Sequence, residues 1–214
     1  MIKFCVILIY SFFAFSTFGQ TERRFLIWNK NEVIIQPWKN ISFNVAENIH
    51  FSPKQNALNQ KYAELNLLHE PEKWFEYGAG FRVVKANTYP GWIQENRIML
   101  MANFLKQYKH FGFKYSNRFE FRSIENDLHH FRYRQEFKVD FPSLTSWGMR
   151  FYTSEESFIK LNEVGFHLIR FYEGLSIVQQ QHFKLKLYYA LEKYKLIENW
   201  GTSDIVGLNM GFQL

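Results

Sequence analysis

The residues of this chain that could carry out acid–base chemistry gather in one short stretch. Asp127, His129 and His130 lie close together, and Ser123 and Ser116 precede Asp127 by four and eleven positions. Hydrolysis requires a base beside a nucleophile or a water, with a third group that orients the base. The stretch has no Gly-x-Ser-x-Gly turn to present a serine nucleophile. We interpret it as a polar turn and predict no catalytic residue, while hydrolysis of a lipid or a peptide at the rim of a barrel stays open as an alternative.

The other histidines show no metal-ligand spacing such as His-x-x-x-His. They stand singly at His50, His69, His110, His167 and His182. The chain has one cysteine, Cys5, and it lies in a segment that we expect to be removed. We therefore predict no metal, no other cofactor and no disulfide.

A larger group of charged residues alternates with aromatic residues between Lys109 and Phe141. The odd positions there include Phe111, Phe113, Tyr115, Phe119, Phe121, Phe131, Tyr133 and Phe137, and the even positions include Lys114, Arg118, Glu120, Arg122, Arg132, Arg134 and Glu136. Side chains on a β-strand point alternately to its two faces, so this stretch predicts a hairpin with one aromatic face and one charged face.

The same period of two recurs in ten runs from Ile41 to the C-terminus. The only candidate for a helix, residues 154–161, is too short and polar to bury a face. Glu47 breaks the alternation of its run, which suggests a bulge or a break that faces a ligand, and the run at 164–176 does not settle which way Arg170 faces. We predict an all-β, closed, antiparallel up-and-down transmembrane β-barrel of about ten strands, with twelve as the alternative.

The N-terminus predicts export. Lys3 precedes an apolar run from Phe4 to Phe15, and small residues lead to a cleavage site before Gln20, as in a signal peptide. The run is too short to span a membrane as a helix. We divide the chain into a signal peptide at 1–19, a lead-in at 20–38 and a barrel at 39–214, and we expect the outer membrane of a Gram-negative bacterium.

Three features favour a barrel with its charged face inside. Glycines recur on that face, where a narrow interior needs small neighbours beside long side chains; they are Gly78, Gly80, Gly112, Gly148, Gly207 and Gly211. Tryptophans stand at the ends of runs, as in the aromatic belts at membrane surfaces; they are Trp74, Trp92, Trp147 and Trp200. The last run continues to Leu214, as a closing strand would. A soluble lipocalin-like barrel in the periplasm, with the opposite polarity, stays open.

The charged face then becomes an interior in which ions of both signs pair. We predict an ionic network in the lumen made of Glu95, Arg97, Lys114, Arg118, Glu120, Arg122, Arg132, Arg134, Glu136, Arg150 and Arg170. The same face also carries Glu64, Arg82, Glu156, Glu192 and Lys186. A purely structural ionic core and a narrow, weakly anion-preferring pore are both compatible with this composition.

Several of these segments together resemble the DUF2490 family, which consists of outer-membrane β-barrel proteins of Bacteroidota and some Proteobacteria. The resemblance runs through residues 92–97 (WIQENR), 116–122 (SNRFEFR), 131–134 (FRYR), 152–158 (YTSEESF) and 169–175 (IRFYEGL). It covers most of the chain after residue 19. The family has no assigned activity, so the resemblance implies fold and location but no catalytic residue.

The composition limits the classes of partner that we expect. Aromatic residues make up 20% of the 214 residues, more than a core of this size needs, so we expect many of the rings to face outer-membrane lipid. The net charge is +6, but the basic residues are spread among acidic ones and form no patch, so we expect no nucleic acid. The barrel assembly machinery is the partner that we expect during biogenesis, and the oligomeric state is left undetermined.

Overall fold

The computed structural model describes residues 23–88, 91–125, 129–162, 165–180, 182–196 and 199–214. The predicted signal peptide, Cys5 and Asp127 lie outside these residues. No helix in the described ranges is long and apolar enough to cross a membrane.

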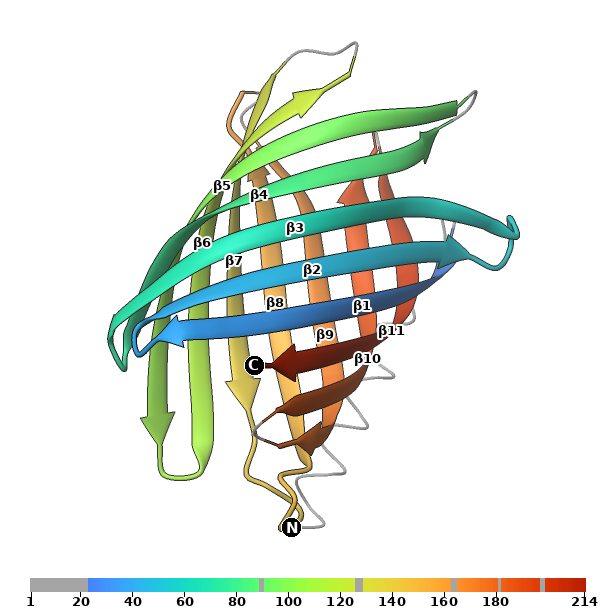
Figure 1. Ribbon diagram of the computed structural model, residues 1–214. Helices are drawn as coiled ribbons and strands as arrows, with labels where there is room; N and C mark the ends of the chain where they lie inside the picture. Colours follow the sequence, from blue (N-terminus) through green and yellow to red (C-terminus); the bar gives the residue numbers. More distant parts are fainter. Residues whose placement is uncertain (1–22, 89–90, 126–128, 163–164, 181, 197–198) are drawn as a thin grey trace.

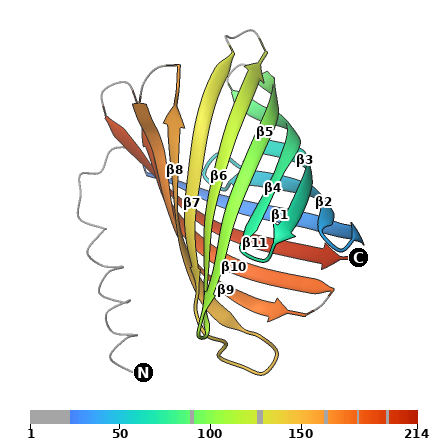
Figure 2. The same cartoon turned by 90° about the vertical axis from the view of Figure 1, so that its left-hand side faces the viewer.

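The described chain folds into eleven β-strands. They are β1 (Arg23–Trp38), β2 (Ile41–Ser52), β3 (Ala57–Glu72), β4 (Phe75–Thr88), β5 (Gly91–Tyr108), β6 (Phe111–Ile124), β7 (His130–Asp140), β8 (Arg150–Lys160), β9 (Gly165–Gln179), β10 (Phe183–Lys195) and β11 (Trp200–Gln213). Each strand pairs with the next one in antiparallel orientation, and β1 pairs with β11 in parallel orientation, which closes the barrel (Figures 1 and 2). The all-β closed barrel is confirmed.

The predicted count of about ten strands is wrong, because the stretch described as a lead-in contains a strand. Residues 23–38 form β1, which pairs with β2 on one side and with β11 on the other. The alternation in β1 is weak because its two faces differ little in polarity. Trp28 lies on the inward face, while Asn29 and Asn31 lie on the outward face. The remaining ten strands coincide with the ten predicted runs.

The odd strand count places the two ends of the barrel wall at opposite openings. Arg23 lies at the same end as the β2–β3 turn at 53–56, and we call this the Arg23 end. Gln213 lies at the other end, with the turns at 39–40 and 73–74, and we call this the Gln213 end. An even count would have put the start of the first strand and the end of the last at one opening.

Three glycines on the inward face, Gly174, Gly201 and Gly207, make room for tyrosines, whereas Gly211 lies against Glu32 as the prediction expected. Tyr188 on β10 stands directly opposite Gly174 on β9 and Gly207 on β11. A Cβ atom added at Gly207 would collide with the Tyr188 ring, and one added at Gly174 would collide with the Tyr152 ring. An aromatic side chain that covers a glycine on the neighbouring strand in this way pins the register of the pair.

Two local ambiguities of the sequence are settled by register. A bulge between Phe158 and Ile159, where β8 pairs with β9, separates the outward Phe166 from the inward Arg170. Glu47 marks no bulge. It lies on the outward face opposite Asn31, whose Nδ2 donates a hydrogen bond of 2.9 Å to its Oε1.

Candidate functional site: the interior of the barrel

The barrel is polar inside and apolar outside. Glu120 and Glu156 have no exposed surface at all, whereas Ile98 and Leu100 on the outward face of β5 are more than half exposed. A soluble globular protein buries its apolar side chains and exposes its charged ones, so this arrangement is inverted. The strands position the site by their alternation alone, because every second side chain points into the lumen.

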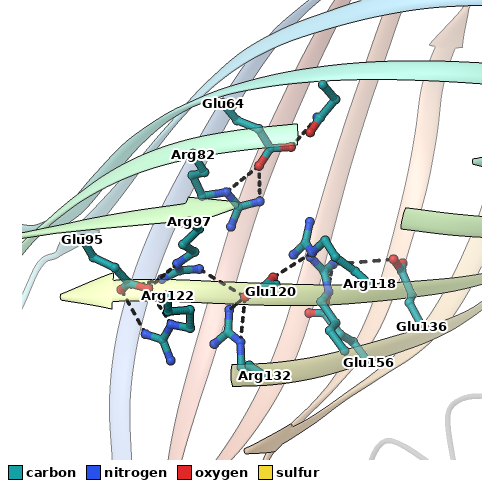
Figure 3. Close-up of polar contacts among 12 residues, drawn as sticks. Glu64, Arg82, Glu95, Arg97, Arg118, Glu120, Arg122, Arg132, Glu136 and Glu156 are labelled. Atoms are coloured by element: carbon teal, nitrogen blue, oxygen red, sulfur yellow. Dashed lines mark hydrogen bonds and ion pairs between the residues drawn. The ribbon is translucent and has the colours of Figure 1, made fainter. Parts of the chain in front are cut away.

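Glu120 on β6 is the centre of the first ion cluster (Figure 3). Its carboxylate accepts from Arg132 Nη2 at 2.5 Å, and it forms ion pairs with Arg118, whose Nε lies 2.7 Å away, and with Arg97, whose Nη1 lies 4.0 Å away. These arginines come from three neighbouring strands, β5, β6 and β7. A buried carboxylate needs such partners, since an unpaired charge in a dry interior is strongly destabilising.

Glu95 on β5 holds two further arginines. Arg97 donates from Nε and Nη2 at 2.6 and 3.0 Å, and Arg122 donates from Nε and Nη2 at 2.5 and 2.9 Å. Arg97 and Arg122 stand directly opposite each other across β5 and β6. Two like charges in such a pair would repel, and the shared carboxylate bridges them through paired, charge-assisted hydrogen bonds.

Glu156 on β8 is the centre of the second ion cluster. It pairs with Arg134, accepts from Arg170 Nη1 at 3.0 Å, and accepts from the Tyr172 hydroxyl at 3.0 Å. Arg170 continues the cluster to Glu192 on β10, with its Nε 2.5 Å from that carboxylate. Arg170 is therefore inward, and the network reaches from β5 to β10.

A third group lies on β3 and β4. Glu64 pairs with Arg82 and accepts from Asn66 Nδ2 at 2.6 Å. The Arg82 guanidinium also lies 4.2 Å from the centre of the Tyr62 ring, within the range of a cation–π contact. Ion pairs thus line the wall from β3 to β10.

The structure places most of the predicted network residues in these clusters, but not all. Glu136 lies at the edge, 3.7 Å from Arg134. Lys114 faces the cavity without an ion pair to a described residue, and Arg150 donates to Ser143 Oγ at 3.3 Å instead of to a carboxylate. Conversely, Glu156 is one of the two centres, although the prediction placed it on the inward face without naming it in the network.

The wall formed by β1 and β8 to β11 carries an aromatic cluster on its inner side in addition to its ion pairs. Trp28, Tyr152 and Tyr188 pack there with the fully buried Ala190 and Ile205. The Trp28 ring also stacks on the ring of His50, with a centre-to-centre distance of 4.0 Å. Sequence reasoning did not assign Trp28 a place inside, since it treated residues 20–38 as a lead-in.

A cavity of about 1220 Å³ lies inside the barrel and is lined both by ion-paired residues and by the aromatic cluster. Fourteen arginines and lysines line it, against only four glutamates. Its lining includes Arg24, Lys54 and Gln55 at the Arg23 end and reaches down to Lys138 and Lys186, whereas no described turn residue of the Gln213 end takes part. The cavity is therefore accessible from the Arg23 end.

The residues considered for hydrolysis do not form a site in the described part of the chain. Ser116 pairs with Glu136, six strand positions from the pair that His130 makes with Arg122, which is about 20 Å at the rise of a β-strand. The His129 ring instead lies 5.3 Å from the ring of Phe121, and Ser123 faces outward. The described residues also contain no group of three or more His, Cys, Asp or Glu that could hold a metal ion.

Comparison with known proteins yields a family and no activity. Residues 25–201 match the family model whose description is "Protein of unknown function (DUF2490)". The matched span begins inside β1 and ends at the start of β11, so it includes most of the first strand and leaves most of the last one outside. No curated protein matches the chain.

Proposed function

Because the chain belongs to the DUF2490 family of proteins of unknown function, we propose a role from its geometry. The protein is an integral outer-membrane β-barrel of a Gram-negative bacterium. Ion pairs narrow its lumen and block passage through the barrel, while a cavity opens toward the Arg23 end, so that any residual conduction prefers anions.

The inverted polarity is the observation that carries this proposal. Large apolar side chains are exposed on strands all around the barrel, for example Phe25, Leu65, Leu100, Phe137 and Leu187. In water such a continuous apolar surface would drive aggregation. In a bilayer it is the surface that lipid requires, while the closed wall pairs each described strand with a neighbour on both sides and so leaves no sheet edge among the described strands.

The exposed tryptophans support the same placement. Trp38, Trp74 and Trp147 lie near the Gln213 end, Trp92 and Trp200 lie near the Arg23 end, and all five are more than 40% exposed. Two such girdles mark the levels at which a membrane barrel meets the lipid headgroups. The strands have 11 to 18 residues, more than the roughly 9–11 residues that a tilted strand needs to cross the hydrocarbon.

A polar row on the outward face of β6, β7 and β8 is the main departure from an apolar coat. Its members satisfy one another: the Tyr133 hydroxyl donates to Asn117 Oδ1, the Tyr115 hydroxyl donates to Gln135 Oε1 at 3.1 Å, and Ser157 donates to Glu155. Internal hydrogen bonds of this kind lower the cost of placing polar groups against lipid.

The ion network favours a closed lumen over an open pore. Buried arginine–carboxylate pairs bridge neighbouring strands from β5 to β10 and fix their long side chains across the interior. An ion that passed through would have to displace paired charges, which costs several kcal/mol for each pair. The excess of cations along the cavity gives any ion that does enter an anionic preference.

Membrane fractionation tests the placement. We expect the protein to stay in the pellet after carbonate and high-salt washes and to migrate faster on a gel when it is not boiled. A protein that washes off, and that runs identically boiled and unboiled, would be the soluble lipocalin-like barrel instead.

Planar bilayers test the lumen. We expect rare, small conductance steps whose reversal potential in a salt gradient indicates anion preference. Large, steady channels would contradict the closed lumen, and cation preference would contradict the charge argument.

A further inference from the structure

Two lysines in the cavity differ from the arginines around them. Lys114 on β6 and Lys186 on β10 both line the cavity, and neither forms an ion pair or a hydrogen bond with any residue in the described ranges. Arg97, Arg132 and Arg170, in contrast, are each bound to a carboxylate within 3.0 Å. These three arginines are therefore neutralised by carboxylates of the barrel wall, whereas the two lysines have no such partner in the described ranges.

Other charges surround these two lysines. Lys138 on β7 stands directly opposite Lys114 and binds Asp140 through Nζ at 2.7 and 2.9 Å. Lys30 on β1 binds Glu32 at 2.5 Å. We call Lys30, Lys114, Lys138 and Lys186 the lysine cluster. It has four cations and two bound carboxylates, and the nearby Glu136 lies beside Arg134.

The strands hold this cluster around one surface of the cavity. Asn209 on β11 is the direct neighbour of Lys30 on one side and of Lys186 on the other. The ammonium groups of Lys138 and Lys186 lie 4.8 and 5.8 Å from the centre of the same Tyr152 ring. The Asn209 Oδ1 atom is buried and accepts no hydrogen bond from the described protein atoms.

Such a cluster costs stability unless an anion completes it. Like charges directly opposite each other on paired strands, as in Lys114 and Lys138, destabilise a sheet. A cleft lined by one sign of charge concentrates counter-ions of the other sign. Lysine is a point-charge ligand for phosphate, and its flexible stem adapts to the position of the anion.

We propose that the lysine cluster binds a small phosphate-bearing solute with at least two negative charges, which enters from the Arg23 end. The cavity volume of about 1220 Å³ exceeds what an inorganic ion fills and suits a solute of drug size or larger. Tyr152 and Tyr188 supply rings beside the cluster against which the uncharged part of the solute packs. The site depends on the barrel interior and not on insertion into a membrane.

Calorimetric titration of the refolded full-length barrel in a non-ionic detergent tests this proposal, with inorganic pyrophosphate as the probe. We expect saturable binding to one site, weakened at least tenfold in Lys114→Met/Lys186→Met. The control is Lys85→Met/Lys106→Met, which removes the same charge from the exposed outward face and should bind as the wild type does. Lys114→Arg/Lys186→Arg should retain binding.

A second measurement needs no variant. Pyrophosphate should protect Lys114 and Lys186 from acetylation by an amine-reactive ester, read by mass spectrometry, while Lys85 and Lys106 react equally with and without it. No saturable heat at millimolar pyrophosphate, equal loss of binding in the control variant, or absence of selective protection would each overturn the proposal.

Further measurements distinguish a free phosphate-bearing solute from a lipid headgroup, and they test the anion site separately from the membrane placement. Binding of vesicles that contain phosphatidic acid without binding of pyrophosphate would indicate a lipid headgroup and contradict a small solute. A protein that binds pyrophosphate but fractionates as soluble would keep this site and lose the membrane placement. A protein that fractionates with the membrane but does not bind pyrophosphate would contradict the anion site and keep the membrane placement.

Discussion

Replacing Glu120 by glutamine should destabilise the barrel more than the same carboxylate-to-amide change at the edge of the ion network. Glutamine keeps the shape and one acceptor oxygen but removes the negative charge. Arg97, Arg118 and Arg132 would then face one another across a fully buried position. The perturbation therefore isolates the charge of the network centre from its packing.

The structure sets the magnitude. Removing one partner of a buried ion pair leaves an uncompensated charge and costs about 3 to 5 kcal/mol. Glu120 has no exposed surface through which water could screen the remaining arginines. We therefore expect the free energy of unfolding to fall by about 3 kcal/mol or more. The expected loss lies toward the lower end of the range because Glu95 still neutralises part of the cluster.

Urea-induced unfolding of the refolded barrel, followed by tryptophan fluorescence and extrapolated linearly, measures this change. The matched control is Glu136→Gln. Its side chain is 27% exposed, and its one ion pair with a described residue joins it to Arg134, at 3.7 Å. A partly exposed pair at this distance contributes about 1 kcal/mol, so the control should lie close to the wild type.

A fall of less than 1 kcal/mol for Glu120→Gln, equal to the control, would refute the reasoning. It would mean that water or a mobile anion reaches the cluster and that the lumen is open at the level of Glu120. Higher conductance of the Glu120 variant in planar bilayers, without loss of stability, would lead to the same conclusion.

Three further predictions follow from other parts of the barrel. Glu173→Leu, on the outward face of β9, should raise the free energy of unfolding in a bilayer by about 1 kcal/mol or more, because lipid solvates a carboxylate poorly; lower stability and aggregation in water instead would favour the soluble barrel. Gly207→Ala should cost about 1 to 3 kcal/mol, because its methyl group meets the tyrosine ring opposite, while Gly165→Ala, with no atom within 4 Å, should cost less in the same urea titration. Single cysteines at Arg24 and Lys39 should react with an impermeant maleimide from opposite sides of the membrane; labelling of both from one side would show that β1 does not span it.

The sequence by itself determined ten of the eleven strands and, for most of them, which side chains share a face. In β6 aromatic residues occupy every odd position from Phe111 to Phe121 except Asn117, and glycine or polar residues occupy the even positions, so periodicity alone identified the strand and its two faces. The same alternation predicted that Arg118, Glu120 and Arg132 would share a surface. Local backbone geometry is sufficient for such statements, because the direction of each side chain follows from its position in the strand.

Only the tertiary structure decided how the wall closes and which charges pair. The parallel pairing of β1 with β11 joins residues almost 180 positions apart, and a strand with polar groups on both faces, as β1 has at Asn29 and Lys30, carries no periodic signal. Partner choice depends on register across several strands. Register gives Glu120 and Glu156 their arginines and leaves Lys114 and Lys186 facing the cavity with no carboxylate partner among the described residues.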